Sequence, residues 1–83
     1  MKYLAKIKIM PLKALLDPQG KAVLNSSKKI GFNFIENVRI GKSIEIELEA
    51  SSREDASQKI DSICQEILIN PIIEYYEYNI SEI

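Results

Sequence analysis

Residues 43–50, Ser-Ile-Glu-Ile-Glu-Leu-Glu-Ala, decide the fold, because apolar and acidic side chains alternate there without a break. A period of two is typical of a strand with one face in the core and the other in water. Ile44, Ile46, Leu48 and Ala50 would then point inward and the three glutamates outward. Two serines follow directly, and serine is a preferred N-cap residue, so we expect a helix to begin at that point.

On the C-terminal side the apolar spacing changes to that of a helix. Apolar residues recur at steps of three and four, which places them on one helical face. That face consists of Ala56, Ile60, Ile63, Cys64, Ile67 and Leu68. Asn70-Pro71 should end the helix, because a residue before proline avoids the α region. Residues 72–80 are predicted to form a last strand, with Tyr76, Tyr78 and Ile80 on one face.

On the N-terminal side, residues 2–10 also alternate and predict a strand. Pro11 has no amide hydrogen to donate to a sheet and should end it. Residues 34–40 are less regular but also predict a strand. Gly41-Lys42 would join that strand to residues 44–50 by a tight turn, since glycine accepts a positive φ freely.

Between these strands, Asp17-Pro18 predicts the start of a helix. Aspartate suits the N-cap and proline suits the first helical position. The helix should run to about Ile30, with Gly31 as its left-handed C-terminal cap. Its predicted inward stripe is narrow and consists of Ala22, Val23, Ser26 and Ile30.

The element order is β-α-β-β-α-β in 83 residues, which predicts one α+β domain spanning residues 1–83. Short connections and right-handed crossovers favour the ferredoxin-like sandwich. Its antiparallel four-stranded sheet has the strand order 4-1-3-2, and both helices lie on one face.

Charge is divided along the chain: residues 1–41 hold eight basic and two acidic side chains, and residues 42–83 hold three basic and ten acidic ones. Such a split can indicate a basic arm for nucleic acid. In the predicted sheet, however, the basic first strand lies beside the acidic third strand, so the charges largely cancel. RNA-binding sheets also need aromatic side chains on the open faces of those strands. This sequence has lysine and glutamate at those positions instead. We therefore expect a solvated or partner-covered face and no nucleic-acid partner.

The composition excludes several kinds of chemistry. Histidine is absent and Cys64 is the single cysteine, so Ser-His-Asp and Cys-His catalysis, an internal disulfide and a cysteine-rich zinc site are excluded. No glycine-rich phosphate loop occurs. No apolar run is long enough to cross a bilayer. We expect a cytoplasmic protein with no metal, cofactor or membrane partner of its own.

Three segments of the chain resemble the PurS family, the small subunit of phosphoribosylformylglycinamidine synthase in de novo purine biosynthesis. They are Asp-Pro-Gln-Gly-Lys-Ala-Val at 17–23, Val-Arg-Ile-Gly-Lys at 38–42 and Asn-Pro-Ile-Ile-Glu-Tyr-Tyr at 70–76. The resemblance extends in order and spacing over nearly the whole chain. Asn25-Ser26-Ser27 and Tyr75 depart from the residue types expected of the family.

The resemblance implies a non-catalytic subunit of an ATP- and glutamine-dependent ligase complex. A glutaminase subunit would release ammonia, and a large synthetase subunit would use it with ATP and Mg²⁺. The small subunit would bridge the two, assist ammonia transfer and form a homodimer or homotetramer. A free-standing ferredoxin-like domain that binds a regulatory small molecule is the alternative, and an enzyme active by itself is a third hypothesis.

The resemblance also singles out eight residues. Five have clear structural uses as a cap, a turn or a helix stop: Asp17, Gly20, Gly41, Asn70 and Pro71. Gln19, Arg39 and Lys42 have weaker structural reasons, and they are the predicted partner contacts.

Overall fold

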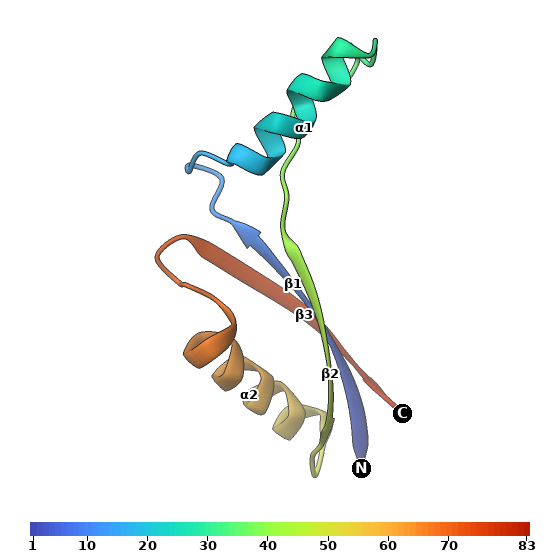
Figure 1. Ribbon diagram of the computed structural model, residues 1–83. Helices are drawn as coiled ribbons and strands as arrows, with labels where there is room; N and C mark the ends of the chain where they lie inside the picture. The colour runs from blue at the N-terminus through green and yellow to red at the C-terminus, as the bar shows by residue number, and fades with distance from the viewer.

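A computed structural model describes residues 1–83. Three strands, β1 (Lys2–Pro11), β2 (Lys42–Glu49) and β3 (Glu74–Glu82), form one antiparallel sheet in the order β2-β1-β3 (Figure 1). Helix α1 (Pro18–Lys29) lies between β1 and β2. Helix α2 (Arg53–Ile63) follows β2 and continues into a π-helical turn, η1 (Cys64–Leu68). The chain is therefore α+β, and none of its helices is long and apolar enough to span a membrane.

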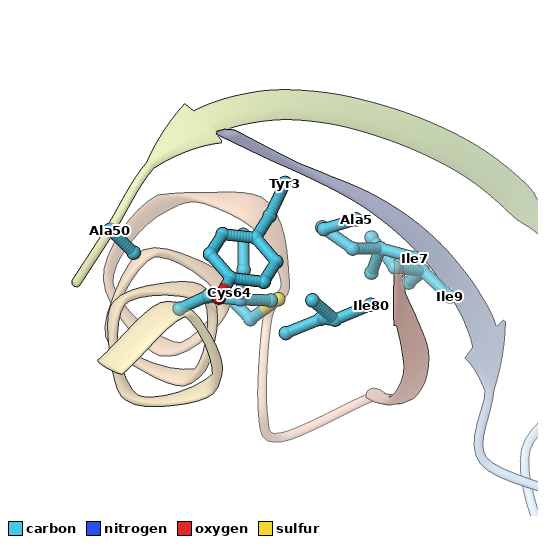
Figure 2. Close-up of a cluster of buried hydrophobic side chains, with 9 residues drawn as sticks. Tyr3, Ala5, Ile7, Ile9, Ala50, Cys64 and Ile80 are labelled. Atoms are coloured by element: carbon cyan, nitrogen blue, oxygen red, sulfur yellow. The ribbon is translucent and has the colours of Figure 1, made fainter. Parts of the chain in front are cut away.

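The core lies between one face of the sheet and α2 (Figure 2). The alternate residues Tyr3, Ala5, Ile7 and Ile9 of β1 are buried there, with Ile7 and Ile9 almost fully enclosed. Ala56 and Ile60 of α2 and Cys64 of η1, all from the predicted helical stripe, belong to the same cluster, and Ala50 and Ile80 complete it. The predicted strand at residues 2–10 and the helix that follows Ser52 are thus confirmed.

The charged face of the sheet also follows the prediction. Lys2 is paired with Glu49 and Lys6 with Glu45 across β1 and β2. On the other side of β1, Lys8 Nζ lies 3.5 Å from a Glu77 carboxylate oxygen. The basic and acidic halves of the sequence are therefore neighbours in space. Exposed pairs of this kind contribute little to stability, so the main consequence is a face with no large field of one sign.

The predicted strand at residues 34–40 is wrong, and with it the four-stranded sheet within one chain. The segment is extended, but it continues in line from β2 away from the sheet and has no strand beside it to complete a ladder (Figure 1). Gly41 makes no tight turn, because Gly31 is the one residue with a positive φ, at 98°. Gly41 is needed for space instead, since a Cβ there would overlap the Ile9 carbonyl oxygen.

The prediction that both helices cover one face is also wrong. Helix α1 and the extended segment after it project from the end of the sheet; we call residues 18–40 the arm (Figure 1). Helix α1 begins and ends where predicted, but Gly20 is its one buried residue. Its predicted inward stripe faces solvent, with Val23 44% and Ile30 71% exposed. The stripe lacks contacts because the chain does not turn back over the sheet.

The projecting arm leaves the chain unusually open. Its radius of gyration is 16.4 Å, against about 12 Å for a compact domain of this length. Its accessible surface is 6041 Å², which is about 1,000 Å² more than a monomer of this mass normally exposes. Part of the excess lies on β2, where Ile44, Ile46 and Leu48 are only half-buried.

One residue of the predicted α2 stripe is misplaced. Ile67 is 71% exposed, although it was expected to face the core. The last turn is π-helical, with Ile69 N–H donating to the Cys64 carbonyl at 3.0 Å. A π turn holds more residues than an α turn, so it rotates Ile67 outward and brings Leu68 against the core.

Candidate functional site

The joint between the arm and the sheet gathers most of the residues that the sequence singled out. Asp17 is its central group. One carboxylate oxygen accepts the Gly20 N–H at 3.0 Å, and the other accepts the Ile40 N–H at 2.9 Å. These backbone N–H groups hold the pKa of Asp17 below its usual value of 3.8. Asp17 is thus both the N-cap of α1 and a bridge to the segment that returns from the arm.

Gly20 allows that bridge to form. A Cβ on Gly20 would overlap the Val38 carbonyl oxygen. The first turn of α1 therefore lies directly against the returning segment, and a larger residue would push the two apart. Asp17, Gly20 and Gly41 all bring backbone segments into close contact at the joint.

Arg39 holds the joint to the sheet. Its guanidinium donates to the Pro11 carbonyl and, at 3.4 Å, to the Tyr75 hydroxyl. Its Cζ lies 5.9 Å from the centroid of the Tyr75 ring, within the range of a cation–π interaction. The base of the arm is thereby fixed relative to β1 and β3. The structure gives Arg39 an intramolecular role, and its contact with a partner stays a prediction.

Gln19 and Lys42 lie together on another side of the joint. Both line an open cavity of about 340 Å³ with Asp17, Gly41 and Glu74. Lys42 Nζ is 3.5 Å from a carboxylate oxygen of Glu74, so the cation is paired and Gln19 is the unpaired polar group. Arg39 does not line this cavity. Of the three predicted contact residues, Gln19 and Lys42 therefore lie together, and Arg39 lies apart from them.

Asn70 and Pro71 lie in the turn that leads into β3. The Asn70 side chain accepts the Ile72 N–H at 3.1 Å, and its backbone N–H donates to Glu74 at 2.9 Å. Glu74 also pairs with Lys42. The Glu74 carboxylate therefore connects this turn to the joint. The Leu12 N–H donates to the Ile73 carbonyl at 2.9 Å and adds a second link.

The titratable groups elsewhere do not form a catalytic arrangement. Cys64 is buried, and burial raises the pKa of its thiol, which makes it a poor nucleophile. The Tyr76 and Tyr78 hydroxyls donate to the two oxygens of Asp61 at 2.9 and 3.0 Å. Burial and the Asp61 carboxylate raise the pKa of Tyr78. No group of side chains is placed to hold a metal ion.

Sequence reasoning missed the apolar surface that the arm exposes. Phe32 and Phe34 are 46% and 78% exposed, and their rings meet edge to face at 5.9 Å. Leu16 and Ile72 near the joint are also exposed. The one available signal was that Phe34 and Ile35 are too apolar for a solvated segment. Periodicity alone assigned that segment to a sheet.

Comparison with known proteins identifies the relatives of this chain. The family model described as PurS, phosphoribosylformylglycinamidine (FGAM) synthase, matches residues 4–82. The curated PurS subunit of Synechocystis sp. is 38% identical over 79 residues, covering 95% of this chain and 79% of that protein. The PurS subunit of Bacillus subtilis is 35% identical over 81 residues, covering 98% and 95%.

Solved structures match over the same length. Methanocaldococcus jannaschii PurS, described as a subunit of formylglycinamide ribonucleotide amidotransferase, has a TM-score of 0.88 at 28% identity and 98% coverage of both chains. A chain in the structure of PurLQS from Thermotoga maritima has a TM-score of 0.90 at 27% identity, covering 98% of this chain and 99% of that one. Scores this high over nearly full chains include the arm.

Proposed function

Because the chain belongs to the PurS family of phosphoribosylformylglycinamidine synthase subunits, we propose that it is the small adaptor of that purine-biosynthetic complex. In this role it bridges a glutaminase subunit and a large synthetase subunit and assists the transfer of ammonia between them. The ATP and Mg²⁺ of the ligase reaction belong to the synthetase. The adaptor acts as one domain over residues 1–83, in the cytoplasm, and catalyses no step by itself.

The observation that carries this proposal is the full-length match, arm included, to a chain of the PurLQS structure. The chemistry agrees with it. Ammonia is largely protonated at neutral pH and is then not a nucleophile, so an enclosed path that excludes water preserves it. An adaptor without histidine adds to such a path none of the imidazole groups that exchange protons near neutral pH.

The adaptor works as a homo-oligomer in which each copy covers apolar surface that the other leaves exposed. The excess surface of about 1,000 Å² per chain is close to the roughly 800 Å² that each partner buries in a standard interface. The excess is apolar in two places: along β2, and along the Val23–Ile30 stripe of the arm. A helix of 12 residues in which Gly20 alone is buried is marginal by itself, so the arm needs a surface to pack against.

A second copy supplies that surface through an exchange of arms. The outer edge of β2 has no neighbour in the sheet, and residues 34–40 are extended and continuous with β2. In a two-fold dimer, this segment of the partner can pair with the free β2 edge while the partner's α1 covers Ile44, Ile46 and Leu48. Each half would then have a ferredoxin-like four-stranded sheet with two helices on one face. Exchange of identical elements is a low-cost route to such a dimer.

Gln19 and Lys42, with Arg39 on the other side of the joint, remain the proposed contacts with the larger subunits. Asp17 links the first turn of α1 to the returning segment by two hydrogen bonds, so the cavity lined by Gln19 and Lys42 is a preformed feature that a partner could recognise. A partner that contacts this cavity would bind only when the arm has this orientation relative to the sheet.

A reconstitution with the glutaminase and synthetase subunits tests the function. Amidine formation is measured with glutamine and, separately, with ammonium as the nitrogen source. We expect omission of the chain to abolish the glutamine-driven reaction while the ammonium-driven reaction continues. Gln19→Ala/Lys42→Ala should weaken the glutamine-driven reaction, and Lys59→Ala on α2 is the matched surface control. Unchanged glutamine-driven activity without the chain would overturn the proposal.

A further inference from the structure

A second cavity, of about 250 Å³, lies between the loop after β1, the start of α1 and the returning segment of the arm. It is lined by the half-buried Leu12, Leu24 and Val38 and by the exposed Leu15, and its basic lining residues, Lys13, Lys21 and Arg39, are called its rim. We call it the basic groove. It contains an apolar surface within reach of three cations, which is an uncommon combination on a chain whose net charge is −1.

The charge of the basic groove is not balanced from within. The one carboxylate beside it, Asp17, already accepts two backbone N–H groups. Arg39 is turned to the Pro11 carbonyl and to Tyr75. Lys13 and Lys21 are exposed and take part in none of the three ion pairs of the chain. The rim therefore offers two free ammonium groups above leucine side chains.

The basic groove lies next to the segment proposed to pair with another copy, since Asn37, Val38 and Arg39 line it, but its helical side is turned away from the apolar stripe of α1. At 100° per residue, the Lys21 and Leu24 side of α1 points about 140° away from the stripe of Val23 and Ile30. A second copy that covers the stripe leaves the Lys21 and Leu24 side of the groove uncovered. The groove is also separate from the cavity of Gln19 and Lys42, with which it shares only Pro11, Leu16 and Asp17.

The dimensions favour a peptide side chain over a small molecule. Sites for drug-sized ligands enclose about 300–1,000 Å³ and carry a few precisely placed polar groups. The basic groove is smaller, has no aromatic side chain on which a base could stack, and has its cations at the rim. This arrangement suits one apolar side chain inserted among the leucines, with acidic neighbours held by Lys13 and Lys21.

We propose that the basic groove binds an acidic segment of one of the two larger subunits, in which an apolar side chain is flanked by aspartate or glutamate. The proposal rests on the adaptor function proposed above. In this proposal the groove determines which subunit the chain binds, which the hydrogen bonds of the joint do not explain. Opposite charges across an interface steer encounter and select the partner.

Charge reversal of the rim tests the proposal. Binding of the purified glutaminase and synthetase subunits is measured for the wild type, for Lys13→Glu/Lys21→Glu and for the control Lys28→Glu/Lys29→Glu. The control makes the same charge change at the far end of α1. We expect the groove variant to raise the dissociation constant for one subunit by about tenfold or more at low salt and to reduce its salt dependence. The control should change it by less than about twofold.

A photo-crosslinking residue at Leu15 identifies the occupant. We expect it to capture a single acidic segment of the subunit whose affinity the groove variant reduces. Capture of another copy of this chain, or of a segment without carboxylates, would overturn the proposal. Equal binding by the wild type and both variants would overturn it too, and would leave the adaptor function standing. If the wild type bound neither subunit, both proposals would fail.

Circular dichroism and the oligomeric mass confirm that each variant folds and associates as the wild type does. If the glutamate variant did not fold, Lys13→Gln/Lys21→Gln would remove the same charges without adding carboxylates. That variant should still weaken binding of the same subunit, and binding equal to that of the wild type would overturn the proposal.

Discussion

At the scale of single residues, Asp17 is the group on which the joint depends most. It accepts one N–H from α1 and one from the returning segment. Asp17→Asn should therefore separate its role as the N-cap of α1 from its role as a bridge to the returning segment. Asparagine is a good N-cap and keeps the bond to Gly20. Its amide NH₂ would face the Ile40 N–H and break the second bond. We expect a lower midpoint of thermal unfolding at pH 7 with α1 still formed.

The lowered pKa of Asp17 adds a pH dependence of known sign. The ionised carboxylate contributes its stability fully above the usual value of 3.8, and that contribution is lost as the pH falls through the lower value of the folded state. Thermal midpoints measured from about pH 5 to about pH 2 should therefore fall less steeply in Asp17→Asn. Glu36→Gln removes an unpaired carboxylate of the same arm and is the control. A slope equal to that of the wild type would contradict this role of Asp17.

Two glycines show how much of the joint the sequence could predict. Gly31 follows a helix, and its positive φ of 98° was expected from that position alone. Gly41 was expected to make a turn for the same conformational reason, but its φ is not positive. Its lack of a side chain makes room for the backbone of β1. A sequence pattern records local conformation and does not show which distant segment comes close.

At the scale of elements, the arm is the feature that periodicity could not place. The strands at 2–10, 44–50 and 72–80 and the starts of both helices were predictable, because their patterns and caps are local. Residues 34–40 have the composition of a strand, but a strand exists only where a neighbour completes its hydrogen bonds. That neighbour is absent within one chain. The shift of Ile67 likewise depends on a π turn that no local pattern predicted.

The exposed stripe of α1 leads to a prediction about this element. We expect Ile30→Asp to disrupt self-association, because it would place a carboxylate in the apolar surface that the second copy covers. The loss should be about 2 kcal/mol or more, which is roughly a thirtyfold increase in the dissociation constant. Sedimentation equilibrium measures it. Asn25→Asp adds the same charge on the exposed opposite side of α1, and association equally weakened by both variants would count against the stripe.

At the scale of the whole molecule, the open shape of the chain and its proposed adaptor role can both be explained by association with a second copy. A core of nine buried apolar residues supports the sheet and α2, while the arm, in which Gly20 is the one buried residue of α1, would gain its packing from another copy in the proposed dimer. In that case oligomerisation is part of folding for this chain, and we expect its stability to depend on concentration. The proposed dimer would present the joints of both copies to the larger subunits, which suits the proposed adaptor role.

If the arms are exchanged, the link between residue 41 and residue 42 decides between an open and a closed chain. Inserting Asn-Gly there supplies a type I′ hairpin turn and should let the arm fold back over its own β2. We expect a monomer with four paired strands, whose radius of gyration falls from the 16.4 Å of the open chain towards the roughly 12 Å of a compact domain. Small-angle scattering and solution mass measure both quantities. Insertion of Thr-Val lengthens the link equally but favours extended backbone, so it should keep the oligomer. An oligomer of unchanged mass after the Asn-Gly insertion would show that the arms are not exchanged and that another surface holds the copies together.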